Sequence, residues 1–124
     1  MTAEQAEAFA RDWIAAWNAH DLDQILSHYS DDVVFSSPFV IRLVGAPSGE
    51  VKGLEALRVY FARGLEAYPD LRFEPIEVLP GAGSIALRYR SVGGREAIET
   101  LELDRAGKIR RSTAHYSAPA PALA

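Results

Sequence analysis

Glu99 has the clearest potential for acid–base chemistry in this sequence. Apolar and polar residues alternate over residues 95–104, and the alternation places Glu99 on the same side as Leu101. A carboxyl group on the apolar side of a strand loses hydration, which raises its pKa and lets it exchange a proton near neutral pH. The competing interpretation is a partly exposed glutamate that pairs with Arg88 or Arg90 on the neighbouring strand.

Histidine is the other residue type whose ordinary pKa suits proton transfer, and the chain has three. His20 and His28 lie at predicted helix ends, where solvated side chains are common. His115 lies late in the last predicted strand and is a candidate acid–base residue.

Several other kinds of chemistry are not expected, because the residues or motifs that they need are absent from the sequence. The chain has no cysteine, which excludes a disulfide framework, a thiol nucleophile and a thiolate metal site. No glycine-rich phosphate loop follows a strand, and no Gly-x-Ser-x-Gly elbow is present. No histidine–carboxylate spacing is typical of a metal site. We therefore expect neither a cofactor nor a metal.

Length and composition favour one globular domain. The chain has 124 residues, of which 48% are hydrophobic and 24% are charged, with a net charge of −4. We predict a single domain over residues 1–117, followed by an Ala/Pro tail at 118–124. The acidic pI of about 5.3 argues against a nucleic-acid partner. No apolar run is long enough to span a membrane, and no secretory signal opens the chain, so cytoplasm is the default expectation.

Hydrophobic periodicity predicts helices first and strands later. Apolar residues at helical spacing predict helices over 3–19 and 54–68, and Asp21 is a suitable cap for a short helix between them. Residues 33–37 predict a strand that ends at Pro38, and residues 39–44 predict another short strand.

From Leu71 onward apolar and polar residues alternate, so the hydrophobic pattern has a period of two. This pattern predicts four strands, over 71–79, 84–92, 95–104 and 108–117. Gly93-Gly94 predicts a two-residue hairpin turn. Helices followed by an antiparallel meander indicate an α+β fold, in which three helices cover one face of a curved sheet.

This order of elements resembles the nuclear-transport-factor-2-like superfamily. Local sequences resemble its SnoaL-like and ketosteroid-isomerase-like branch, namely WIAAWNAHDLD at 13–23, YSDDVVF at 29–35, KGLEAL at 52–57 and LDRAGKI at 103–109. The resemblance implies a cone of three N-terminal helices on a curved, mainly antiparallel sheet, with an apolar pocket at its wide end. It also implies a homodimer through the outer sheet face. The branch includes isomerases, polyketide cyclases, dehydratases, hydrolases and non-catalytic binding proteins.

The resemblance also implies roles for individual residues. Glu99 aligns with a carboxylic acid that helps to hold the substrate oxyanion in ketosteroid isomerases. Ser37 stands where those enzymes have an aspartate base before a proline, and Trp13 stands where they have a donating tyrosine. Serine has no useful basicity and an indole N–H only donates, so the usual steroid isomerisation is not expected. The alignment places Tyr116 in the pocket and His115 on the outer face, unless a one-residue bulge reverses the strand.

The candidate catalytic residues are therefore Glu99, Ser37 and His115. The predicted substrate-binding residues are the aromatic side chains Trp13, Trp17, Tyr29, Phe39, Tyr60 and Tyr116. Such a pocket suits a flat hydrophobic molecule. The leading hypothesis is a small cofactor-independent isomerase, cyclase or dehydratase that transfers a proton on a hydrophobic carbonyl-bearing molecule. The alternatives are a non-catalytic binding module for a small apolar ligand and a dimerising partner-binding domain.

Overall fold

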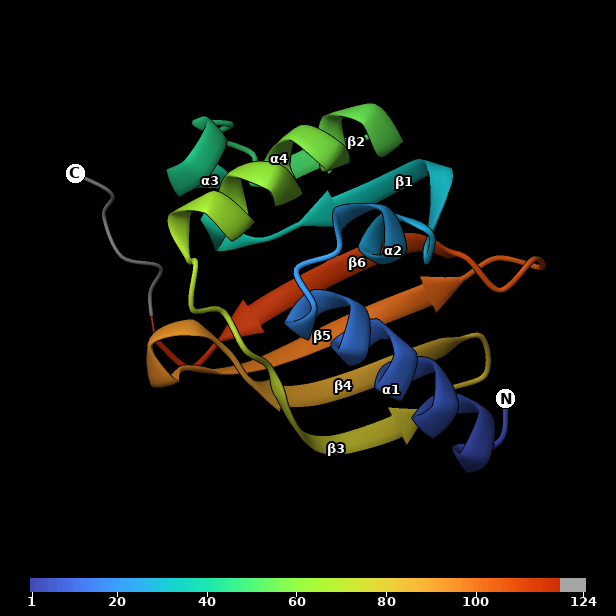
Figure 1. Ribbon diagram of the computed structural model, residues 1–124. Coiled ribbons are helices and arrows are strands. Elements are labelled where there is room, and N and C mark those ends of the chain that lie inside the picture. Colours follow the sequence, from blue (N-terminus) through green and yellow to red (C-terminus); the bar gives the residue numbers. More distant parts are fainter. Residues whose placement is uncertain (119–124) are drawn as a thin grey trace.

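The protein is an α+β structure in which helices fill the concave side of a curved, open sheet. The computed structural model describes residues 1–118. Its helices are α1 (Ala3–Asn18), α2 (Leu22–Leu26), α3 (Pro38–Val44), α4 (Leu54–Ala67) and the 3₁₀ helix η1 (Val92–Gly94). Its strands are β1 (Tyr29–Ser36), β2 (Glu50–Lys52), β3 (Glu74–Pro80), β4 (Ser84–Arg90), β5 (Glu96–Leu103) and β6 (Ile109–Tyr116) (Figure 1).

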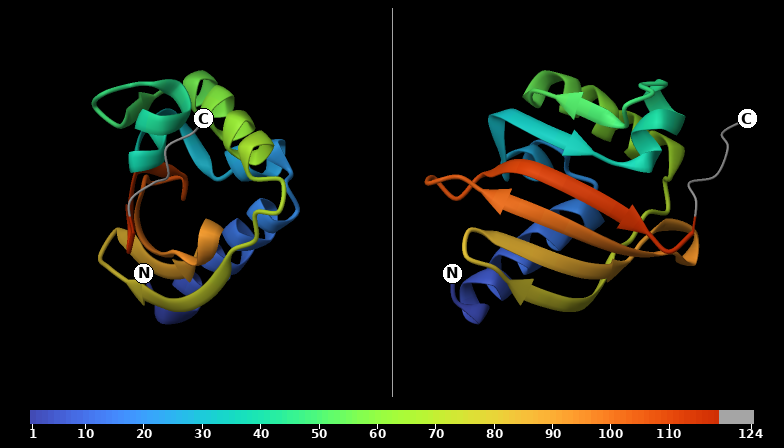
Figure 2. Two further views of the ribbon diagram at one scale, coloured as in Figure 1. Left: turned by 90° about the vertical axis from the view of Figure 1, so that its left-hand side faces the viewer. Right: turned by 180° about the vertical axis from the view of Figure 1, so that it is seen from behind.

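The sheet has six strands in the order β2-β1-β6-β5-β4-β3. Strands β3 to β6 form the predicted antiparallel meander, whereas β1 pairs with β6 in parallel. Figure 2 shows the sheet curving around α1, α2 and α4 without closing into a barrel. The predicted fold class is thus confirmed, and the interior between sheet and helices is where a site can form.

Helix α1 begins and packs as its sequence predicts. The Thr2 hydroxyl accepts from the Gln5 backbone N–H at 3.1 Å, and the Gln5 side chain accepts from the Thr2 N–H at 2.9 Å. This reciprocal pair is a capping box. The stripe that α1 buries against the sheet is Ala6, Ala10, Trp13, Ile14, Ala16 and Trp17.

Residues 38–44 form helix α3, so the predicted short strand at 39–44 is wrong. Ser37 caps this helix by accepting from the Phe39 N–H at 3.2 Å, and Pro38 occupies the first turn, where its missing N–H costs nothing. Gly45 ends the helix with a φ of 70°, a left-handed conformation that glycine adopts without strain. The cap and the stop override the β-branched composition of the segment.

The predicted two-residue hairpin at Gly93-Gly94 is also wrong. Arg90 pairs with Glu96 across β4 and β5, so five residues connect the strands, and both glycines lie within that loop at φ values of 65° and 73°. Strand β3 begins at Glu74 rather than at Leu71. The segment before it is instead tied to the end of α1, which positions it at the edge of the interior.

The outer face of the sheet carries ion pairs. Arg88 pairs with Glu96 at 2.6 Å, and Arg110 pairs with Glu102 at 3.3 Å. Ile98 lies on the same face and is 48% exposed. A homodimer through this face stays a prediction.

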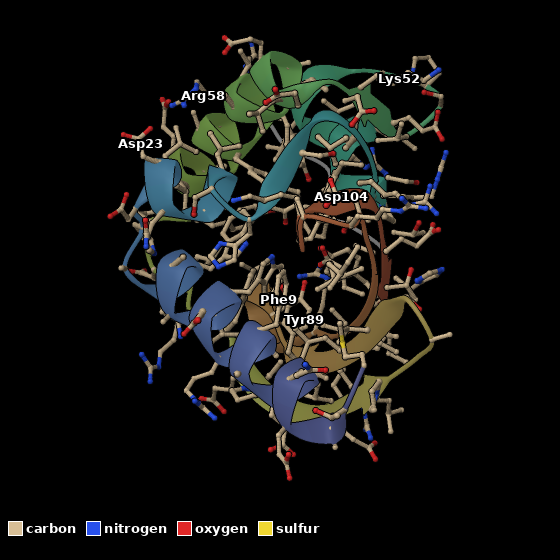
Figure 3. All side chains as sticks on the ribbon, turned by 90° about the vertical axis from the view of Figure 1, so that its right-hand side faces the viewer. Phe9, Asp23, Lys52, Arg58, Tyr89 and Asp104 are labelled. Carbon is tan, nitrogen blue, oxygen red and sulfur yellow. The ribbon has the colours of Figure 1, made fainter. Side chains whose placement is uncertain are left out.

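Surface pairs also link the helices. Arg58 on α4 contacts Asp23 on α2 at 3.0 Å (Figure 3), a pair whose two side chains are both largely exposed. Exposed pairs of this kind contribute little to stability. The predicted tail at 118–124 lies outside the described residues except for Ala118.

Candidate functional site

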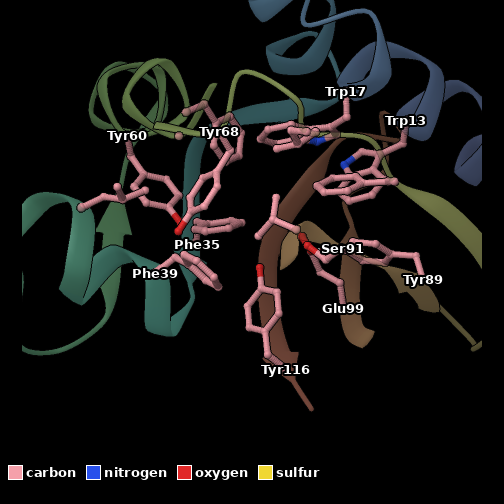
Figure 4. A pocket seen from close by; sticks show the side chains of 16 residues that line it. Trp13, Trp17, Phe35, Phe39, Tyr60, Tyr68, Tyr89, Ser91, Glu99 and Tyr116 are labelled. Atoms are coloured by element: carbon pink, nitrogen blue, oxygen red, sulfur yellow. The ribbon is translucent and has the colours of Figure 1, made fainter. Parts of the chain in front are cut away.

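An apolar cavity of about 60 Å³ lies between the sheet and the helices. Ten of its sixteen lining residues are aromatic, and Glu99 is the one residue among them with a carboxyl group; none is basic. Figure 4 shows Trp13 and Trp17 entering from α1, Tyr60 from α4, and Glu99 and Tyr116 from the sheet. The predicted convergence of aromatic side chains is thus found, and it surrounds a single acidic group.

Glu99 is held by hydrogen bonds from its two neighbouring strands. It is 3% exposed on β5, where it lies opposite Leu87 of β4 and Ala114 of β6. Residues two positions from a directly opposed partner lie on the same face of a sheet. Tyr89 and Ser112 occupy those positions, and their hydroxyls donate to Glu99 Oε1 and Oε2, each at 2.7 Å.

The burial of Glu99 makes its carboxyl group hold its proton more tightly. Loss of hydration raises the pKa of Glu99, and the hydrogen bonds from Ser112 and Tyr89 oppose this by favouring the charged form. The predicted alternative, an ion pair with Arg88 or Arg90, is wrong. Arg88 alternates with the buried Leu87 and pairs with Glu96 on the outer face instead.

A group of hydroxyls lies on the wall formed by α3, α4 and β6. Burial raises the pKa of both Tyr60 and Tyr116 far above the ordinary value of tyrosine, while hydrogen bonding with Ser37 opposes the rise. Both tyrosines therefore stay protonated at neutral pH and can donate hydrogen bonds. Ser37 is 2% exposed, and it also caps α3, so its oxygen is already engaged.

The structure brings most predicted site residues to the cavity. Glu99, Trp13, Trp17, Phe39, Tyr60 and Tyr116 line it. Tyr29 and Ser37 are buried just behind the lining. The Tyr29 hydroxyl accepts a hydrogen bond from the Trp13 indole N–H at 3.0 Å, so it positions Trp13 rather than facing the cavity.

His115 does not reach the cavity. It is exposed on the outer face, with its Nδ1 3.3 Å from the Ile98 carbonyl oxygen. Its neighbours Ser112 and Ala114 point inward, and no bulge lies between them and Tyr116. The geometry therefore assigns no acid–base role in the cavity to His115.

Sequence reasoning missed three contributors to the site. Tyr89 and Ser112 hold Glu99, but their role follows from the register of three strands, which the sequence does not specify. Tyr68 lines both the cavity and a shallow groove outside it, formed by residues 67–72 and 91–93, so it lies at the mouth. Its position at the end of α4 resembled an ordinary core position.

The mouth is fixed by contacts between α1 and the segment before β3. Asn18 accepts from the Phe73 N–H at 2.7 Å and donates to the Phe73 carbonyl at 3.0 Å. His20 Nε2 lies 2.8 Å from the Leu71 carbonyl. Because Leu71 and Phe73 line the cavity, these contacts hold part of its rim in place.

Within residues 1–118, no group of three His, Cys, Asp or Glu side chains is placed to hold a metal ion. Over the same residues, the structure has no helix of the length and apolarity that crossing a membrane requires.

A sequence profile of the SnoaL-like domain matches residues 10–117. The chain belongs to the SnoaL-like family. A SnoaL-like protein of unknown function from Burkholderia thailandensis is 43% identical, with a TM-score of 0.90, and the match covers 94% of this chain and 98% of that one. No curated protein sequence matches the chain.

More distant SnoaL-like folds share the architecture. Bal32a, from a soil-derived mobile gene cassette, is 20% identical with a TM-score of 0.74, and the match covers 93% of this chain and 91% of that one. SalBIII is described as an epoxide hydrolase/cyclase-like enzyme in pyran ring formation in the polyether salinomycin. It is 20% identical with a TM-score of 0.73, and the match covers 94% of this chain and 95% of that one. Other similar structures carry names that include hydroxylase, polyketide cyclase and isomerase. These structures, each less than 25% identical to this chain, show that the fold is shared.

Proposed function

We propose that this SnoaL-like protein is a small cofactor-independent enzyme that transfers a proton on a hydrophobic, carbonyl-bearing molecule. Isomerisation, cyclisation and dehydration all need such a step. The observation that carries the proposal is Glu99, a carboxyl group buried in an aromatic cavity, with a hydroxyl donor on each oxygen and no basic side chain in the cavity lining. Perturbed carboxyl groups in cavities are characteristic of catalytic sites.

Glu99 supplies the proton-transfer group in this mechanism. As a carboxylate it removes a proton from the carbon next to the substrate carbonyl, and as the resulting acid it returns that proton to the substrate. Tyr60 and Tyr116 donate hydrogen bonds to the carbonyl oxygen as negative charge develops there. A positioned acid–base group of this kind contributes about 10²- to 10⁴-fold in rate.

The size of the cavity limits the substrate. At about 60 Å³ it is smaller than the roughly 300–1,000 Å³ of typical small-molecule sites. A single ring can occupy it after small movements of the side chains at the mouth, such as Tyr68. We therefore expect a compact substrate, or one that inserts only its reacting ring.

Hydrogen–deuterium exchange tests the proposal without knowledge of the natural substrate. Cyclohexanone and cyclohex-3-enone in D₂O are followed by NMR, which detects exchange next to the carbonyl and migration of the double bond. The wild-type protein should accelerate these reactions, and Glu99→Gln should lower the rate by about 10²-fold or more. Glu102→Gln is the matched control, because Glu102 lies on the same strand but pairs with Arg110 on the outer face. Equal rates for the wild type and Glu99→Gln would exclude this role.

A binding module for a small apolar ligand is the second candidate. Ser37 favours it, because this serine stands at the position of the isomerase base and its oxygen caps α3. In that case cyclohexanone would raise the melting temperature of both the wild type and Glu99→Gln, and neither would catalyse exchange.

A further inference from the structure

Two buried polar atoms have no hydrogen-bond partner within residues 1–118, and both belong to residues that line the cavity. They are the Trp17 indole nitrogen and the Tyr68 hydroxyl oxygen. Buried polar groups in folded proteins are nearly always hydrogen-bonded, and each exception calls for a physical reason. Both exceptions belong to residues of one cavity, so a molecule bound there is the natural partner for them. Because neither atom is accessible in the free protein, such a molecule reaches them as the side chains of the wall move.

The surroundings of the two atoms explain why they stay unpaired. The Tyr29 hydroxyl lies close enough to Trp17 for the indole to affect its pKa, but it accepts its hydrogen bond from Trp13. Ser37 is engaged with Tyr60 and Tyr116, and Tyr68 influences both tyrosines only through charge. Neither atom therefore makes a hydrogen bond within the protein.

The two atoms lie on the helical wall, across the cavity from the acidic group. Trp17 comes from α1 and Tyr68 follows α4, whereas Glu99 comes from the sheet (Figure 4). An indole nitrogen only donates, and a phenol hydroxyl donates readily. A molecule that satisfies them must present an acceptor to this wall while its reacting carbon faces Glu99.

We propose that Tyr68 and Trp17 bind a second acceptor group of the substrate, so that the substrate is a compact dicarbonyl or hydroxy-carbonyl compound rather than a simple ketone. It is not an anion, because no basic side chain lines the cavity to match one. The inference rests on the proposed function for the orientation of the reacting carbon. Tyr68 is the specificity-determining residue, since its side chain lines both the cavity and the groove outside it.

Binding of matched cyclic ketones tests this inference. The ligands are cyclohexanone, cyclohexane-1,2-dione and cyclohexane-1,4-dione, which differ in the number and spacing of their carbonyl groups. NMR titration measures each affinity for the wild type and Tyr68→Phe, a variant that loses only the hydroxyl oxygen. At least one dione should bind the wild type about five- to ten-fold more tightly than cyclohexanone, and Tyr68→Phe should abolish that preference while leaving cyclohexanone unaffected.

The two tryptophans provide an independent readout. Both of the chain's tryptophans line the cavity, so both indole N–H signals report on it. The Trp17 signal should move downfield when the preferred dione binds, because its N–H gains an acceptor. The Trp13 signal should move less, because its N–H already donates to Tyr29.

The free protein provides the structural control. Tyr68→Phe should unfold at the same temperature as the wild type or higher, because the oxygen it removes has no partner. Tyr89→Phe should unfold at a lower temperature, because it deletes a donor to Glu99. Equal destabilisation by the two changes, a dione preference that survives in Tyr68→Phe, or the absence of any dione preference in the wild type would each overturn the inference. Binding is measured at equilibrium, so these outcomes do not depend on whether Glu99 transfers a proton.

Discussion

The stability of the wild-type protein relative to Glu99→Gln should fall as the pH rises. Burial raises the pKa of Glu99 in the folded protein above its ordinary value of 4.5, which applies to the unfolded chain. Below pH 4.5 the carboxyl group is protonated in the folded and unfolded states, so its ionisation does not lower the stability. As the pH rises from there, the unfolded chain releases its proton while the folded protein retains it, so unfolding becomes easier. The loss is complete once the pH has passed the folded pKa.

The size of this loss follows from the pKa difference. Each unit by which the folded pKa exceeds the unfolded one removes about 1.4 kcal/mol of stability. The free energy of unfolding of a small domain is about 5–15 kcal/mol, so the effect of a difference of one pKa unit is measurable. Glutamine has the shape of glutamate and does not titrate. Its amide can keep both contacts, because the Tyr89 and Ser112 hydroxyls can each accept as well as donate.

Urea unfolding between about pH 4 and pH 8 provides the measurement. The free energy of unfolding of Glu99→Gln is subtracted from that of the wild type at each pH. Glu96 acts in the opposite direction, because Arg88 lowers its pKa and the resulting stability is lost as the pH falls. It is present in both proteins, so it cancels in the difference. A difference that stays level or grows with pH would show that Glu99 does not have a raised pKa.

Two further changes follow from the same contacts. Ser112→Ala leaves Glu99 Oε2 buried without its donor, so the free energy of unfolding in urea should fall by about 1–3 kcal/mol. The loss of stability with rising pH should also extend to higher pH, because this hydrogen bond no longer lowers the pKa of Glu99. Unchanged stability would mean that the 2.7 Å contact contributes nothing. Ser37→Ala removes the cap of α3, so the free energy of unfolding should fall by about 0.5–2 kcal/mol. Ser48→Ala on the nearby loop is the control, and equal losses of stability in the two variants would argue against the cap.

The residues that local rules place correctly are those whose environment depends on their own strand or helix. Alternation alone puts Glu99 inside, and helical spacing alone predicts the apolar face of α1. The outward position of His115 follows from the family resemblance, and the absence of a bulge in β6 agrees with it. The partners of Glu99 depend on how three strands align, and that register is a long-range property. Residues 39–44 show a different limit, because a short apolar run fits a strand or a helix equally well. The cap at Ser37 and the stop at Gly45 contained the deciding signal.

The parallel pairing of β1 with β6 has a consequence for how the chain folds. Val34 lies beside Arg111, so this pairing joins two segments that are separated by most of the sequence. Contacts between distant segments slow folding, because a large loop must close before they form. During synthesis, at about 5–20 residues per second, the helices and β1 emerge many residues before β6. Until β6 has been made, β1 and β5 lack the strand that joins them, and this half-made chain is the form most exposed to aggregation.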